Sequence, residues 1–193
     1  MAALVQIEIA DRKLLDSIGA QLAESARRSG AWLACRPGCT QCCIGPFDIT
    51  QLDAHRLREG LRALAAVDPA RAAAVRTRAE AYVLVAPASL DDLPCPALDP
   101  VTGYCDLYDA RPITCRTFGP VTWIDEATLG ACELCYTDAT EQQMSECVVD
   151  IDPEGLEGAL LDALAAHGIS GMTIVASALA ADCTRTPPAV RPE

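Results

Sequence analysis

The sequence predicts a mainly α-helical fold with a turn-rich, cysteine-containing middle region and few or no strands. About half of the 193 residues are apolar, but aromatic residues make up only 4% and alanine supplies much of the apolar content. Small side chains of this kind suit closely packed helices better than an aromatic-rich sheet. Apolar residues also recur at helical spacing in several segments. A chain of this length can bury one good core, so we predict one domain over residues 1–183.

The first predicted helix covers residues 9–29 and ends at Gly30. Its apolar face is formed by residues spaced three and four apart, namely Leu14, Leu15, Ile18, Leu22 and Ala26. The second helix is expected to begin after Thr50, an N-cap residue with Asp53 three positions later. Asp68 and Pro69 should end it, and Pro69 suits the first turn of a third helix that runs to about Ala86.

Residues 87–118 contain five prolines, which break any long periodicity and predict mostly turns. Pro112 could open a short helix that carries Cys115, and residues 121–124 indicate a brief strand. A further helix is expected from Leu156 to Gly168, and residues 172–181 suit either a helix or a strand. The proline-containing tail, residues 184–193, is predicted to be disordered.

The charge and the N-terminal sequence exclude several classes of function. A net charge of -12 argues against nucleic acid as a partner, because that affinity comes largely from Lys and Arg contacts to phosphate. The N-terminus lacks the pattern of a signal peptide, and no segment offers the uninterrupted apolar run of a membrane span. We therefore predict a cytoplasmic protein that does not act in a membrane.

The eleven cysteines are the main functional signal. Disulfides rarely persist in the cytoplasm, so metal ligation is the leading interpretation. Buried apolar cysteines or a redox disulfide would be the alternative, but core cysteines should be scattered along the chain. Here most of them fall in short spacings between Cys35 and Cys135, which predicts a metal-binding core over residues 35–135.

The strongest motif is CRPGCTQCC, which holds Cys35, Cys39, Cys42 and Cys43. Its Pro-Gly pair predicts a tight turn that folds the sulfurs back toward one point. Four thiolates within nine residues can enclose a metal at little loop-closure cost. The side chains of adjacent Cys42 and Cys43 diverge, however, so we expect two metals or one cluster completed from elsewhere.

A second group supplies the remaining candidate ligands. Cys95, Cys105 and Cys115 recur at ten-residue intervals in a turn-rich segment, and Cys132 and Cys135 form a CxxC pair. Eight thiolates would make two four-cysteine sites with Cys135 spare or exchanging, but one cluster with additional structural or redox thiols is also consistent. The candidate metal ligands are Cys35, Cys39, Cys42, Cys43, Cys95, Cys105, Cys115, Cys132 and Cys135. Cys147 and Cys183 stand alone and are interpreted as buried or free thiols.

All-cysteine coordination suits both iron-sulfur clusters and zinc. His55 and His167 lie on predicted helices outside the cysteine groups, so a mixed Cys/His zinc site is not expected. We favour iron-sulfur, possibly as two clusters, with zinc as the alternative. Arg111 and Arg116 flank Cys115; they could offset thiolate charge and tune a centre, or pair with Asp106 or Asp109 at the surface.

The combined pattern CxxxCxxCC at 35–43, then CPxL and GxCxLYxxRPxxCRxF at 95–118, resembles the YkgJ-type cysteine-cluster family of zinc- or iron-chelating domains. The resemblance covers about residues 35–135 and implies a metal-binding domain. Residues 49–58 resemble the helix that follows the family's first cluster, and Cys132 resembles a further family cysteine. Some members place another cysteine near the position of Gly119, so the eighth ligand is less well supported than the first seven.

Three classes of function are consistent with these features. The leading one is a cluster-binding redox or electron-transfer protein with a protein redox partner. The second is a structural or metal-handling module in which zinc staples the turn-rich middle to the helices. The third is a cluster-dependent, methyltransferase-like enzyme that modifies a protein, because one branch of the family acts with flagellin lysine methylation. The spacing of Cys35, Cys39 and Cys42 also occurs in radical SAM enzymes, but this chain lacks their repeated strand-helix units. The sequence does not decide whether the protein is an enzyme, or its oligomeric state.

Overall fold

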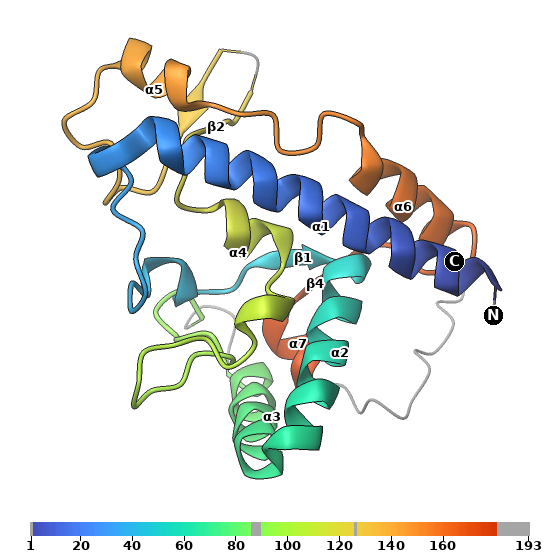
Figure 1. The fold of residues 1–193 in the computed structure, drawn as a ribbon. Helices are drawn as coiled ribbons and strands as arrows, with labels where there is room; N and C mark the ends of the chain where they lie inside the picture. The colour runs from blue at the N-terminus through green and yellow to red at the C-terminus, as the bar shows by residue number, and fades with distance from the viewer. Residues whose placement is uncertain (1, 86–89, 126, 181–193) are drawn as a thin grey trace. The chain divides into compact units, whose positions relative to one another are not determined.

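The computed structural model describes residues 2–85, 90–125 and 127–180. Within these ranges the chain forms seven α-helices and four short strands, which confirms the mainly α prediction (Figure 1). The predicted tail, the lone Cys183 and the end of the third predicted helix at Ala86 lie outside the described residues.

The chain divides into two compact units. The first unit comprises Met1–Arg36 and Arg116–Leu164, and the second comprises Pro37–Cys115 and Ala165–Glu193. A unit defined by its internal contacts is not necessarily a domain that folds alone, so the single domain expected from the sequence stays a prediction.

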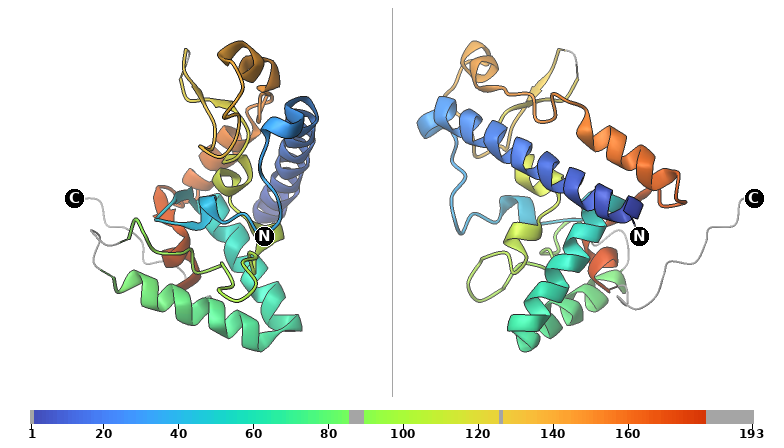
Figure 2. Two further views of the ribbon diagram at one scale, coloured as in Figure 1. Left: turned by 90° about the vertical axis from the view of Figure 1, so that its left-hand side faces the viewer. Right: turned by 45° about the vertical axis from the view of Figure 1, so that its right-hand side comes forward.

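The second unit is built around three helices. α2 (Gln51–Val67), α3 (Pro69–Val83) and α7 (Val175–Ala180) pack against one another (Figure 2). The side chains between them are small or aliphatic, as the composition predicted. The buried core contains Ile49, Ala54, Leu57, Leu61, Ala72, Val75, Ala79, Ala97, Leu107, Val175, Ala178 and Leu179.

Local capping signals place α2 and α3 where the sequence predicted. The Thr50 side chain accepts a hydrogen bond from the backbone N–H of Asp53 at 3.1 Å, which satisfies a donor of the first turn of α2. Asp68 ends α2 and caps α3 by accepting from the N–H of Arg71 at 3.0 Å, with Pro69 at the first helical position. Each boundary is decided by residues that are close in sequence.

The segment at residues 172–181, which suited either a helix or a strand, forms both in turn. β4 (Met172–Ile174) pairs antiparallel with β1 (Asp48–Thr50), with Ile49 opposite Thr173. The chain then continues as α7. β-Branched Thr173 and Ile174 lie in the strand, and the alanine-rich residues that follow Val175 lie in the helix, as their propensities favour.

The first unit contains the longest helix, α1 (Ala2–Ser29), which begins earlier than predicted. A 3₁₀ turn, η1 (Gly30–Trp32), follows it. The predicted strand at 121–124 is β2 (Thr122–Trp123), which pairs antiparallel with β3 (Leu129–Gly130). The predicted helix at 156–168 is α6 (Leu156–Ala165), whose last residue falls in the second unit.

The sequence analysis missed one helix of the first unit, α5 (Glu141–Cys147). Its signal was present: the Thr140 side chain accepts from the N–H of Gln143, and the Gln143 side chain accepts from the N–H of Thr140. This is a capping box, in which each residue satisfies the other's free donor. The sequence does not reveal this helix through periodicity, because it is only seven residues long and has no run of apolar residues at helical spacing.

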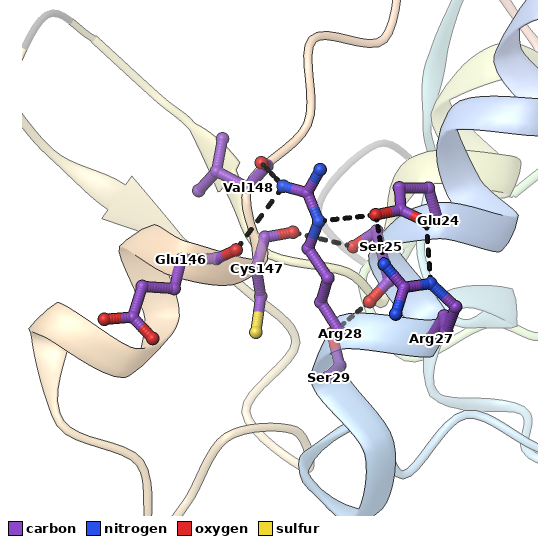
Figure 3. Close-up of polar contacts among 8 residues, drawn as sticks. All are labelled: Glu24, Ser25, Arg27, Arg28, Ser29, Glu146, Cys147 and Val148. Atoms are coloured by element: carbon purple, nitrogen blue, oxygen red, sulfur yellow. Dashed lines mark hydrogen bonds and ion pairs between the residues drawn. The ribbon is translucent and has the colours of Figure 1, made fainter.

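Residues near the end of α1 bind the C-terminal end of α5 (Figure 3). The Ser25 hydroxyl donates to the carbonyl of Cys147 at 3.1 Å, and Arg28 donates to the carbonyls of Glu146 and Val148 at 3.5 and 3.3 Å. The last carbonyls of a helix have no partner within it, and a cation there also complements the helix dipole. These contacts fix Cys147 in the core of the first unit.

No helix among the described residues is long and apolar enough to cross a membrane. This agrees with the sequence analysis, which found no candidate span. The cytoplasmic location stays a prediction.

Asp53 connects the start of α2 to the segment that carries Cys115. Its carboxylate accepts from the Arg56 guanidinium at 2.5 Å and from the backbone N–H of Ile113 at 2.9 Å. The side chains of Asp53 and Arg56 are 2% and 5% exposed, so this ion pair is shielded from water. The sequence predicted only the capping position of Asp53, and its second role depends on a partner 60 residues away.

We predict that replacing Asp53 with alanine destabilises the protein by about 3–5 kcal/mol, because it removes the charge that faces the buried Arg56 guanidinium. Asp68→Ala is the matched control: Asp68 is also an N-terminal carboxylate of a helix, but it is exposed, and its loss should cost about 1 kcal/mol. Urea unfolding of both variants measures the difference. Equal losses would show that burial of the Asp53 pair is unimportant.

Candidate metal centre

The Pro37-Gly38 turn forms as predicted and leads to the vicinal cysteines. Gly38 has a φ of 87°, a left-handed conformation that glycine adopts without strain. The chain then forms the 3₁₀ turn η2 (Gln41–Cys43), with the N–H of Cys43 bonded to the carbonyl of Thr40 at 2.8 Å. This tight turn carries Cys42 and Cys43 and follows Cys39 directly.

A hairpin brings Cys95 and Cys105 beside this turn. The N–H of Cys95 donates to the carbonyl of Cys43 at 2.7 Å. Within the hairpin, the backbone N–H of Asp106 donates to the carbonyl of Ala97 at 2.7 Å. Leu98 and Cys105 form an antiparallel β-bridge. Two segments that are far apart in sequence, the turn and the hairpin, are therefore joined through their backbones, and each contributes two cysteines.

Cys115 lies on α4 (Ile113–Thr117), the short helix predicted to follow Pro112. The first N–H of α4, that of Ile113, is the one bonded to Asp53. A buried carboxylate on α2 thus sets where α4 begins, and with it the place of Cys115.

The thiols of Cys42 and Cys43 interact directly. The Cys43 thiol donates a hydrogen bond to the Cys42 sulfur, which lowers the pKa of Cys42 to about 6. The same bond raises the pKa of Cys43, and burial and the nearby thiols of Cys95 and Cys105 raise it further. The vicinal pair therefore favours one thiolate that shares the proton of its neighbour.

The other three thiols of this group favour their protonated form when no metal is bound. Burial raises the pKa of Cys95 to about 11 and that of Cys115 to about 12, and it also raises the pKa of Cys105. For Cys115, the negative charges of Cys95, Cys42 and Cys105 add to this effect. The charges of Cys95 and Cys105 likewise act on the Cys43 thiol.

Arg111 is the cation that faces this group. Its charge lowers the pKa of the Cys42, Cys105 and Cys115 thiols, against the effect of burial, which raises the pKa of each. Its guanidinium carbon lies 3.6 Å from the centre of the Tyr108 ring. Asp106, one of the two acidic residues considered as a surface partner, is paired with Arg71 and Arg78. That Arg111 offsets thiolate charge in a metal centre stays a prediction.

Four further cysteines lie in the first unit: Cys35, Cys132, Cys135 and Cys147. The last three are buried in one apolar cluster with Val121 and Tyr136. The predicted grouping of Cys35 with Cys39, Cys42 and Cys43 therefore crosses the boundary between the two units. Cys147 is buried, as predicted, but it shares its cluster with the CxxC pair.

Gly119 lies between Cys35 and the CxxC pair. A Cβ atom at position 119 would lie 2.0 Å from the sulfur of Cys35, and the Gly119 carbonyl accepts from the N–H of Cys132 at 3.5 Å. A larger residue at this position would displace the Cys35 side chain. Glycine at position 119 therefore leaves room for the Cys35 side chain.

In the part of the chain that the structure describes, no three Cys, His, Asp or Glu side chains are already arranged to hold a metal ion. The donor set nonetheless fits zinc or iron chemistry. It consists of thiols, the ligands that zinc and iron-sulfur clusters share. His55 and His167 are exposed and lie outside the thiol groups, on α2 and just after α6.

Fold and thiol groups together define a small, mainly helical cysteine-cluster protein. A family model, CxxCxxCC, described as "Putative zinc- or iron-chelating domain", matches residues 34–148, well over half of the chain. The chain belongs to this family of zinc- or iron-chelating domains, with which the resemblance to YkgJ-type proteins is consistent. Neither the curated proteins nor the solved structures contained a match.

We predict that the metal-free protein loses stability as the pH rises above about 9. Cysteine ordinarily has a pKa of 9.0, and the folded state raises it to about 11 in Cys95 and about 12 in Cys115. Between these values the folded state binds more protons than the unfolded state, so unfolding becomes easier as the pH increases. Below pH 9 these thiols are protonated in both states, and their contribution to the free energy of unfolding is fully present.

Thermal unfolding of metal-free protein across this pH range provides the measurement. Tyrosine and lysine also titrate there, so a variant with Cys95→Ser and Cys115→Ser is the control. The wild type should lose melting temperature more steeply than the control. Parallel curves would contradict the assignment.

We also predict that Gly119→Ala destabilises the protein by about 1–3 kcal/mol, because the new methyl group meets the sulfur of Cys35. In a Cys35→Ala background that sulfur is gone, and the same substitution should cost less. Urea unfolding of the four proteins gives the coupling energy. A coupling of zero would mean that the two residues do not touch.

Proposed function

We propose that the protein binds an iron-sulfur cluster through its cysteine thiolates and uses it in a redox or electron-transfer reaction. One observation carries the proposal: the N–H of Cys95 donates to the carbonyl of Cys43 at 2.7 Å, which brings the hairpin of Cys95 and Cys105 beside the turn of Cys42 and Cys43. The charges of Cys95, Cys42 and Cys105 also raise the pKa of the Cys115 thiol, which supports its place near them. Membership of a zinc- or iron-chelating family supports metal as their ligand.

The number of thiols favours a multinuclear centre. The second unit alone holds six described cysteines, because Cys39 joins the five thiols already named. A single zinc ion takes four ligands, and adjacent Cys42 and Cys43 do not easily serve one ion. An iron-sulfur cluster, with several irons, can use thiolates that diverge. When bound, such a cluster would supply one-electron chemistry.

The surroundings of the thiols suit a centre that carries negative charge. Arg111 counteracts the accumulation of charge on three of the thiols. A cation beside such a centre would raise its reduction potential, since reduction adds an electron. The exposed Tyr108 ring beneath Arg111 places this group near the surface, where a protein redox partner could approach.

Zinc is the second candidate, and a different observation favours it. Between α3 and α4 the described residues form no regular element longer than the 3₁₀ turn η4 (Tyr108–Ala110). Cys95 and Cys105 pack against the buried core of the second unit from this segment. A zinc ion bound there would staple loops to helices and contribute folding energy.

We predict that protein purified without oxygen is brown and contains iron and acid-labile sulfide in near-equal amounts. Metal and sulfide analysis, with the visible absorption spectrum, makes this measurement. Replacing Cys95 and Cys105 with serine should remove most of the iron, whereas Cys183→Ser, at a cysteine that lies outside the cysteine motifs in the sequence, should not. A colourless protein with stoichiometric zinc would replace the redox proposal with the zinc module.

A further inference from the structure

We propose that Arg78 is a positioning residue for the thiols of Cys95 and Cys105. This inference rests on the proposed metal centre and concerns a residue that lies outside every cysteine motif. Arg78 lies on α3, and its side chain extends from the helix to the hairpin. This side chain is 28% exposed.

One guanidinium holds both strands of the cysteine hairpin. Its Nε donates to the carbonyl of Pro96 at 2.8 Å, and its Nη2 donates to the carboxylate of Asp106 at 2.6 Å. Pro96 directly follows Cys95, and Asp106 directly follows Cys105. Since both contacts come from one planar group, the two cysteine backbones are fixed relative to each other and to α3.

Asp106 makes the contact specific. Its side chain is 1% exposed, and Arg71, two turns before Arg78 on α3, also binds it. Its backbone N–H bonds to Ala97 across the hairpin at 2.7 Å, so the residue is fixed at both its backbone and its side chain. Two cations, Arg71 and Arg78, thus pair with this one buried carboxylate.

These contacts are specific to the candidate ligands, because each atom that Arg78 binds belongs to the residue directly after a candidate ligand. Outer residues that orient metal ligands typically change metal affinity by about 10–100-fold when they are replaced. The geometry also requires a planar donor pair, which lysine lacks. Lysine at position 78 could keep the ion pair or the carbonyl contact, but not both in the same orientation.

The test compares Arg78→Gln with Arg76→Gln. Arg76 is an exposed residue on the same helix, two positions earlier, and it makes no ion pair among those found in the described chain. Both variants and the wild type are prepared metal-free and reduced, and circular dichroism confirms that each is folded at the temperature used. Cobalt(II) is then titrated without oxygen in competition with a chelator, and the thiolate-to-cobalt absorption bands are recorded.

We expect Arg78→Gln to bind cobalt at least tenfold more weakly and with altered bands, while Arg76→Gln matches the wild type. Arg78→Lys should recover the affinity only in part. Unchanged affinity in Arg78→Gln would overturn the role of Arg78 and leave the metal centre standing. If the wild type itself bound neither cobalt nor iron, the metal centre and this inference would fall together. Should Arg78→Gln be unfolded, the comparison of Arg78→Lys with Arg76→Gln decides in the same way.

Discussion

The cysteine loops of the second unit depend on buried carboxylates that tie them to helices. Asp53 binds the first N–H of α4, and Asp106 is held by two arginines of α3. The loops themselves have little regular structure, so their backbone must be fixed by contacts of this kind. Both carboxylates are almost fully buried and both face arginine, which makes each pair costly to break on one side.

Each of these two carboxylate contacts, called anchors here, ties a different group of thiols to a different helix. The anchor on α2 fixes the segment with Cys115, and the anchor on α3 fixes the hairpin with Cys95 and Cys105. The turn with Cys42 and Cys43 joins the hairpin through its backbone. The fold thus buries these thiols, and burial disfavours their charged thiolate forms, so the pKa values of Cys43, Cys95 and Cys115 are raised. A bound metal would stabilise the thiolates, because its positive charge takes the place of the protons that the buried thiols otherwise keep.

The first unit treats its cysteines differently. Cys132, Cys135 and Cys147 are buried in an apolar cluster, and α1 holds the last of them through its backbone carbonyl (Figure 3). Buried cysteine can pack as a small apolar residue, and all three do so here. The role of Cys132 and Cys135 as metal ligands stays a prediction, and the matched family range, residues 34–148, includes all three cysteines.

The sequence by itself determined the features that depend on neighbouring residues. Thr50, Asp68 and Pro69 set the ends of α2 and α3, Pro112 preceded the helix of Cys115, and the cysteine spacing identified the family. Only the tertiary structure decided which thiols meet and what holds them. Asp53 and Ile113 are 60 residues apart, Arg78 and Asp106 are 28 apart, and Ser25 and Cys147 are 122 apart. Contacts over such separations leave no periodic trace in the sequence, because they are made by single side chains that the packing of helices brings together.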